Sequence, residues 1–94
     1  MASSFGRQLC AALEAARLSQ NGFAKSVGIS QGTLSRIIAA QRKPPVDDIP
    51  VWAQRLGMDQ QQEAEFLHAA LLAAGLPRLA HRLHTLKQAL QRET

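Results

Sequence analysis

Residues 20–39 of this 94-residue chain, QNGFAKSVGISQGTLSRIIA, constrain its fold more than any other stretch. Gly28 falls between two short runs with helical spacing of their apolar residues, and glycine adopts the positive φ of a tight turn at little cost. Ser30 precedes the second run, where its hydroxyl can accept a hydrogen bond from a first-turn backbone N–H. Ala24 is small at the point where two such helices would cross most closely. The stretch therefore predicts two short helices joined by a tight turn.

The apolar residues of this stretch occupy positions that would fill the angle between the two helices: Phe23, Val27, Ile29, Leu34 and Ile37. With residue 20 counted as first, alanine stands fifth, glycine ninth, and these residues fourth, eighth, tenth, fifteenth and eighteenth. This pattern resembles the helix-turn-helix of the phage-repressor family, also called the XRE family, which includes the lambda and 434 repressors and Cro. A basic-x-Pro element and a helix ending in Leu-Gly follow, as in that family, so the resemblance covers about residues 5–57.

Composition and spacing favour helices in the rest of the chain. Tyrosine is absent and β-branched residues are sparse, whereas Ala, Leu and Gln are abundant. Apolar spacing predicts four further helices, over about 4–18, 47–56, 60–74 and 77–92. Asp47 or Asp48 should cap the second of these, Asp59 should cap the third, and Gly75 should end the third.

The fold expected is therefore all-α. It is a compact bundle of five or six helices with a lambda-repressor-like helix-turn-helix and a C-terminal dimerisation helix. Residues 1–57 would form the helix-turn-helix DNA-binding domain. Residues 58–94 would form a C-terminal helical dimerisation extension packed on it, so that both parts make one structural unit.

The net charge of +4 is distributed unevenly along the chain. Residues 1–46 hold six basic residues against one acidic residue, whereas residues 47–65 hold one basic residue against five acidic residues. Residues 66–94 are basic again, with four basic residues against one acidic residue. Because a basic block coincides with the motif, we expect a polyanionic partner, double-stranded DNA.

The outward face of the second motif helix is the expected base-reading surface. A DNA major groove accepts a helix whose N-terminal residues reach base edges, where glutamine pairs with adenine, arginine with guanine, and serine or threonine with either. The candidate base contacts are Gln31, Gly32, Thr33, Ser35 and Arg36. Gly32 has no side chain, which allows a close approach of the backbone. For Arg36 the alternative is an ion pair with a surface carboxylate such as Asp47.

The resemblance implies roles for residues around this surface. In the family, the glutamine that begins the first motif helix contacts a phosphate and supports the glutamine that begins the second, and Gln20 and Gln31 stand at those positions. The basic loop after the second helix touches the DNA backbone in relatives, and Arg42 and Lys43 match it. Asn21 is well placed for a phosphate, since backbone N–H groups point outward at a helix start. Gln20 has the alternative role of capping its own helix.

Leucines near the C-terminus recur at spacings of three and four, at Leu76, Leu79, Leu83, Leu86 and Leu90. This is the a/d pattern of a paired helix over two heptads, and it predicts a homodimer interface. A twofold dimer suits an inverted-repeat operator, whose half-sites lie about 34–36 Å apart. The alternative is that this leucine stripe packs back on its own chain.

Other classes of function receive no support from the sequence. No apolar run approaches the roughly 20 residues of a membrane span, so no membrane partner is expected. The lone Cys10 is consistent with a reducing cytoplasm. No nucleophile–base set or Gly-rich phosphate loop is visible, so we expect neither catalysis nor a cofactor. The three histidines lack a completing cluster of Cys or carboxylate ligands, so no metal site is expected.

The function expected is that of a cytoplasmic homodimeric repressor from a phage or a prokaryote, associated with the nucleoid when bound to DNA. It would occlude a promoter and could regulate its own gene. An alternative is an antitoxin that binds a protein toxin through residues 47–65 or the leucine stripe and autoregulates its operon. A structural helical domain without DNA binding is a third reading, and the intact set of Gln20, Gln31 and Arg36 argues against it.

Overall fold

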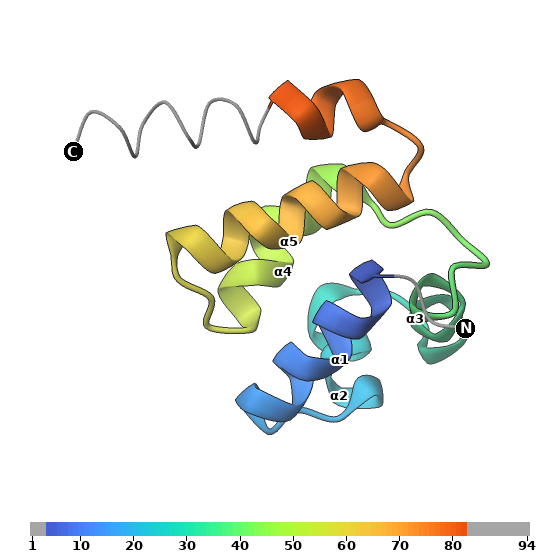
Figure 1. Ribbon diagram of the computed structural model, residues 1–94. Coiled ribbons are helices and arrows are strands. Elements are labelled where there is room, and N and C mark those ends of the chain that lie inside the picture. Colours follow the sequence, from blue (N-terminus) through green and yellow to red (C-terminus); the bar gives the residue numbers. More distant parts are fainter. Residues whose placement is uncertain (1–3, 83–94) are drawn as a thin grey trace.

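The computed structural model describes residues 4–82, and every regular element within that range is helical. In chain order the elements are α1 (Ser4–Ala16), α2 (Gln20–Val27), α3 (Gln31–Ile38), the 3₁₀ turn η1 (Val46–Asp48), α4 (Ile49–Arg55) and α5 (Gln60–Ala73). A further helical segment covers residues 77–82. Figure 1 shows α1, α2 and α3 grouped on one side of α4 and α5, with the segment 77–82 on the opposite side of α5. The prediction of an all-α bundle is confirmed.

The two motif helices begin at the residues that the sequence predicts. Ser19 and Ser30 are the N-caps of α2 and α3, and each side chain accepts a hydrogen bond from a first-turn N–H, at 2.9 and 3.1 Å respectively. Gly28 ends α2 in the left-handed conformation, with a φ of 78°. Because Ser19 caps α2, the alternative interpretation of Gln20 as the cap is wrong.

The helix α1 ends two residues earlier than predicted, and α3 ends at Ile38. Arg17 and Ala40 follow these ends in left-handed backbone conformations, with φ of 57° and 63°. The N–H of Leu18 donates to the carbonyl oxygen of Leu13 at 2.9 Å and closes the end of α1. A left-handed conformation costs a residue other than glycine roughly 1–2 kcal/mol, so glycine is the usual marker of such a helix end. Arg17 and Ala40 are not glycines, and the sequence therefore does not mark these two ends.

The start of α4 differs from the prediction. Residues 46–48 form a 3₁₀ turn in which the N–H of Asp48 donates to the carbonyl oxygen of Pro45 at 2.9 Å. The backbone of Asp48 is already right-handed, with φ −95° and ψ −5°, and its side chain accepts no capping hydrogen bond. Capping requires an extended backbone at the cap residue, so the predicted cap at Asp47 or Asp48 is wrong.

Both ends of α5 are as predicted. Asp59 accepts a hydrogen bond from the N–H of Gln62 at 2.7 Å, and the side-chain oxygen of Gln62 accepts one from the N–H of Asp59 at 3.0 Å. Gly75 follows α5 with a φ of 78°, and the N–H of Leu76 donates to the carbonyl oxygen of Leu71 at 2.9 Å. This arrangement ends the helix and turns the chain. The segment 77–82 then returns over α5 (Figure 1).

Two aromatic pairs join the helices in the core. Phe5 of α1 stacks on Phe66 of α5 with ring centroids 4.8 Å apart. Phe23 of α2 meets Trp52 of α4 edge to face, with centroids 5.3 Å apart. All four rings are almost completely buried, and such pairs contribute about 0.5–1.5 kcal/mol beyond their buried area. The lone tryptophan is therefore a core residue, and α4 and α5 support the helix-turn-helix.

A close approach between α1 and α3 depends on a buried glycine. A Cβ atom at Gly6 would lie 3.1 Å from the carbonyl carbon of Ile38 and nearer still to its carbonyl oxygen. The atoms in the way belong to the backbone at the end of α3, so no side chain can rotate to make room. The absence of a side chain at Gly6 therefore allows the short distance between α1 and the end of α3.

Candidate nucleic-acid interface

The helix α3 buries one face and presents the other to solvent. Leu34 and Ile37 are buried, and α3 packs against α1 and α2. The exposed face carries four of the five candidate base contacts, Gln31, Gly32, Ser35 and Arg36. The fifth, Thr33, is half-buried. The structure thus brings the predicted base-reading residues together on the first two turns of one exposed helix.

The hydroxyl of Thr33 takes part in the cap of α3. Ser30 Oγ accepts a hydrogen bond from the N–H of Thr33 at 3.1 Å and donates one to Thr33 Oγ1 at 2.9 Å. This second bond fixes the orientation of the Thr33 side chain and uses part of its acceptor capacity. Among the five candidate base contacts, Thr33 is therefore the one whose side chain is hydrogen-bonded within the cap of α3.

Gly32 is not required by the packing of the protein. A Cβ atom there would have Ser30 Oγ as its only neighbour, at 4.0 Å, and Gly32 has no positive φ. A glycine inside a helix nonetheless costs about 0.5–1 kcal/mol relative to alanine. The packing of the described residues therefore gives no reason for glycine at this exposed position.

The guanidinium of Arg36 is available for an external partner. Within residues 4–82 it forms no ion pair, so the alternative pair with Asp47 is not formed. The carbonyl oxygen of Arg36 accepts hydrogen bonds from the N–H groups of Gln41 and Arg42, at 2.8 and 3.2 Å. These bonds hold the start of the basic loop against the end of α3.

The start of α2 supplies the two other polar candidates. Gln20 is half-buried and Asn21 is exposed, both in the first turn of α2. Because the Ser19 side chain caps this turn, both amide side chains keep their hydrogen-bonding groups for other partners. An amide at a helix N-terminus, where free N–H groups also point outward, suits a phosphate.

Comparison with known families agrees with this geometry. A family model described as a helix-turn-helix domain matches residues 4–66, about two thirds of the chain. The chain belongs to this helix-turn-helix family. The match supports the predicted resemblance to XRE-like DNA-binding proteins and extends it from α1 into α5. No curated protein and no solved structure matches the chain.

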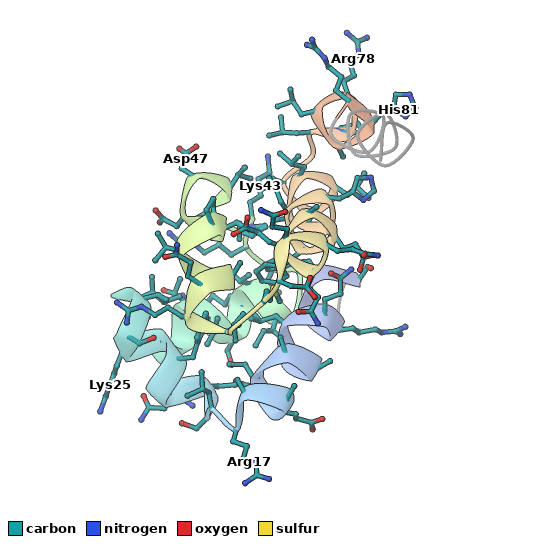
Figure 2. The ribbon with its side chains drawn as sticks, turned by 90° about the vertical axis from the view of Figure 1, so that its left-hand side faces the viewer. Arg17, Lys25, Lys43, Asp47, Arg78 and His81 are labelled. Atoms are coloured by element: carbon teal, nitrogen blue, oxygen red, sulfur yellow. The ribbon has the colours of Figure 1, made fainter. Side chains whose placement is uncertain are left out.

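In this helix-turn-helix protein the two candidate phosphate contacts of the basic loop, Arg42 and Lys43, lie in different surroundings. Arg42 is exposed, and its backbone is bonded to the end of α3. The ammonium group of Lys43 instead lies 4.0 Å from the position that a Cβ of Gly75 would take. Figure 2 shows Lys43 near the end of α5, away from Lys25 on α2. The C-terminus of a helix carries partial negative charge, so this position suits a cation without any DNA.

Two residues that position this interface were not among the predicted site residues. Ser19 follows the local rule for an N-cap, and its place directly before the QNG run was a usable signal. Gly6 gave no such signal, because the atoms that exclude a side chain there belong to Ile38, far along the chain. The first omission was avoidable from sequence and the second was not.

Neither a metal site nor a membrane span is found in the part of the chain that the structure describes. Residues 4–82 contain no group of three or more His, Cys, Asp or Glu residues that could hold a metal ion. No helix in this range is long and apolar enough to cross a membrane.

Proposed function

We propose that this protein is a homodimeric transcriptional repressor, from a phage or a prokaryote, that places α3 in the major groove of an inverted-repeat operator. The observation that carries the proposal is the face of α3, where exposed polar residues lie opposite buried Leu34 and Ile37. In a cell it would act in the cytoplasm, on the nucleoid, and occlude a promoter. Autoregulation is the simplest control for such a protein.

In this proposal Gln31 and Arg36 make the selective base contacts, since glutamine pairs bidentately with adenine and arginine with guanine. Ser35 and Thr33 add less selective bonds, and Gly32 lets the helix backbone approach the bases. The phosphate contacts are Gln20, Asn21, Arg42 and Lys43. Phosphate contacts fix the orientation of the protein on the duplex, whereas base contacts select the sequence.

The experiment that tests this function is in vitro selection from a library of random DNA duplexes at about physiological salt, where non-specific binding is weak. We expect an inverted repeat to be enriched, with half-site centres about 34–36 Å apart or a multiple of that spacing. Enrichment of a single half-site would support sequence reading without the dimer. Failure to enrich any sequence would contradict the proposal and favour an antitoxin whose main partner is a protein.

If Arg42 and Lys43 keep their positions in the structure when DNA is bound, their alanine variants should differ in the salt dependence of DNA binding. The proposal that both residues contact phosphate predicts the same change for both. We expect Arg42→Ala and Lys43→Ala each to weaken binding equally on all sequences and to reduce the slope of log K against log salt by about one unit. Binding isotherms at four salt concentrations measure this slope. An unchanged slope for Lys43→Ala, with a lower melting temperature, would assign Lys43 to the end of α5 instead.

The proposed dimer uses the leucine stripe. Leu76 and Leu79 are 40% and 48% exposed, unlike Ala80 on the same segment, which is fully buried. Leu83, Leu86 and Leu90 lie outside the described residues. We expect Leu79→Asp to give a folded monomer that binds the operator at least tenfold more weakly, because both half-sites are no longer bound together.

Leu72→Asp is the matched control for this variant. Leu72 is 50% exposed, like Leu79, but it lies on α5 beside Ser4 and Gln8 of α1 rather than on the stripe. Analytical ultracentrifugation should find the control dimeric and Leu79→Asp monomeric. If both variants remained dimeric with unchanged operator affinity, the stripe would be excluded as the interface.

A further inference from the structure

A second surface of the molecule has the character of a binding groove. It holds about 520 Å³ and lies between η1, the start of α4, α5 and the segment 77–82. Leu67 and Leu71 of α5 line it. Val46 and Pro50 line one side, and Leu79 lines the other. A groove of this size and apolar character fits side chains from a helix of another molecule.

The two rims of this groove carry opposite charges. Asp47 stands on the η1 side and Arg82 on the side of the segment 77–82. Within residues 4–82 neither side chain forms an ion pair. Asp47 and Arg82 are the charged side chains among the described residues that line the groove.

These charges make the groove complementary to a second copy of the same chain. In a twofold interface, a contact between residue i of one copy and residue j of the other occurs twice, with the roles exchanged. A groove with an acidic rim and a basic rim can therefore meet itself with both contacts favourable. Leu79, half exposed on the basic rim, supplies an apolar side chain for the groove of the other copy.

We propose that this groove receives the segment 77–82 of a second copy, with Asp47 of each copy facing Arg82 of the other. The inference rests on the proposed homodimer and identifies its interface. In this interface Leu79 of each copy, one member of the leucine stripe, packs into the groove of the other copy. Figure 2 shows Asp47 and Arg78 at the end of the molecule remote from Arg17 and Lys25, so this interface leaves α2 uncovered.

Charge reversal in separate chains tests the pairing. Asp47→Arg alone and Arg82→Asp alone each place like charges at both contacts of a homodimer. We expect each variant to dissociate about tenfold more readily than the unaltered protein, with a smaller effect at high salt. An equimolar mixture of the two variants should dimerise again, because both contacts of the mixed dimer then join opposite charges. Sedimentation velocity of the full chains measures all three states.

Arg78→Asp is the matched control. It makes the same charge change on the same segment, but the Arg78 side chain projects away from the rest of the molecule in Figure 2. We expect this variant alone to dimerise like the unaltered protein, because both Asp47–Arg82 contacts of its homodimer are intact. Dissociation of Arg78→Asp to the same extent as Arg82→Asp would show a general effect of charge on this segment and overturn the pairing. Circular dichroism of each variant checks that the exposed substitutions leave the helices folded.

The possible results separate this inference from the proposed function. A dimer that no single charge reversal weakens would overturn the groove as the interface and leave the homodimer intact. Recovery in the double variant Asp47→Arg/Arg82→Asp, without recovery in the mixture, would overturn it too, because the two charges would then meet within one chain. An unaltered protein that is monomeric at concentrations where it binds an inverted repeat would overturn the inference and the proposed homodimer together.

Discussion

Gly6→Ala is expected to lower the free energy of unfolding by about 1–3 kcal/mol, although alanine favours helices more than glycine does. The added methyl group would collide with the backbone of Ile38, so α1 and α3 would have to move apart. For a domain of this size, each kcal/mol lowers the melting temperature by about 4–8 °C. Thermal unfolding followed by circular dichroism measures the loss.

Gly32→Ala is the control for this prediction, because it makes the same chemical change in a helix with open space around it. We expect it to raise the free energy of unfolding by about 0.5–1 kcal/mol. We also expect it to weaken operator binding, since the methyl group lies on the proposed base-reading face. Equal stabilisation by both substitutions would contradict the tight contact of α1 with α3. Unchanged operator affinity in Gly32→Ala would remove Gly32 from the interface.

Arg36→Ala is expected to cost about 1–3 kcal/mol of operator binding at each half-site, and to relax the choice of base at one position of that half-site. The reason is that Arg36 is exposed on α3 and forms no ion pair within residues 4–82, so its guanidinium is free to pair with a guanine. Repeating the in vitro selection with this variant, and measuring its affinity for point-mutated operators, tests both parts of the prediction.

Arg78→Ala removes the same charge from the far end of the molecule and should leave the selected sequence unchanged (Figure 2). This comparison separates a base contact from a general effect of net charge. If Arg36→Ala weakened binding equally on every sequence, Arg36 would touch only phosphate. If the two variants behaved alike, neither a base contact nor a local phosphate contact could be assigned to Arg36.

Most of the helix-turn-helix could be predicted because its signals are local. The turn at Gly28, the cap at Ser30 and the capping box at Asp59 each depend on a backbone conformation and a hydrogen bond within three or four residues. The prediction of a cap at Asp47 or Asp48 was wrong because another local structure takes precedence over the capping rule there. Asp48 is a good capping residue, but the 3₁₀ turn before it already holds its backbone in a helical conformation.

The positions of the candidate site residues on α3 could also be predicted from local signals in the sequence. The alternation of buried and exposed residues on α3 follows from helical periodicity, so the exposed positions of Gln31, Ser35 and Arg36 could be inferred from spacing alone. The direction in which a long flexible side chain points could not be inferred from spacing. The ammonium group of Lys43 lies beside Gly75, more than thirty residues along the chain, because the loop after α3 runs toward the end of α5.

The sequence by itself determined the helical class, the turn between α2 and α3, and the polar face that α3 presents, since each follows from residues close together in the chain. Only the tertiary structure decided that α1 approaches α3 through Gly6 and that η1, α5 and the segment 77–82 border an open groove with oppositely charged rims. These features depend on how helices cross. The crossing is fixed by packing between residues distant in sequence, and such packing leaves no periodic pattern in the chain.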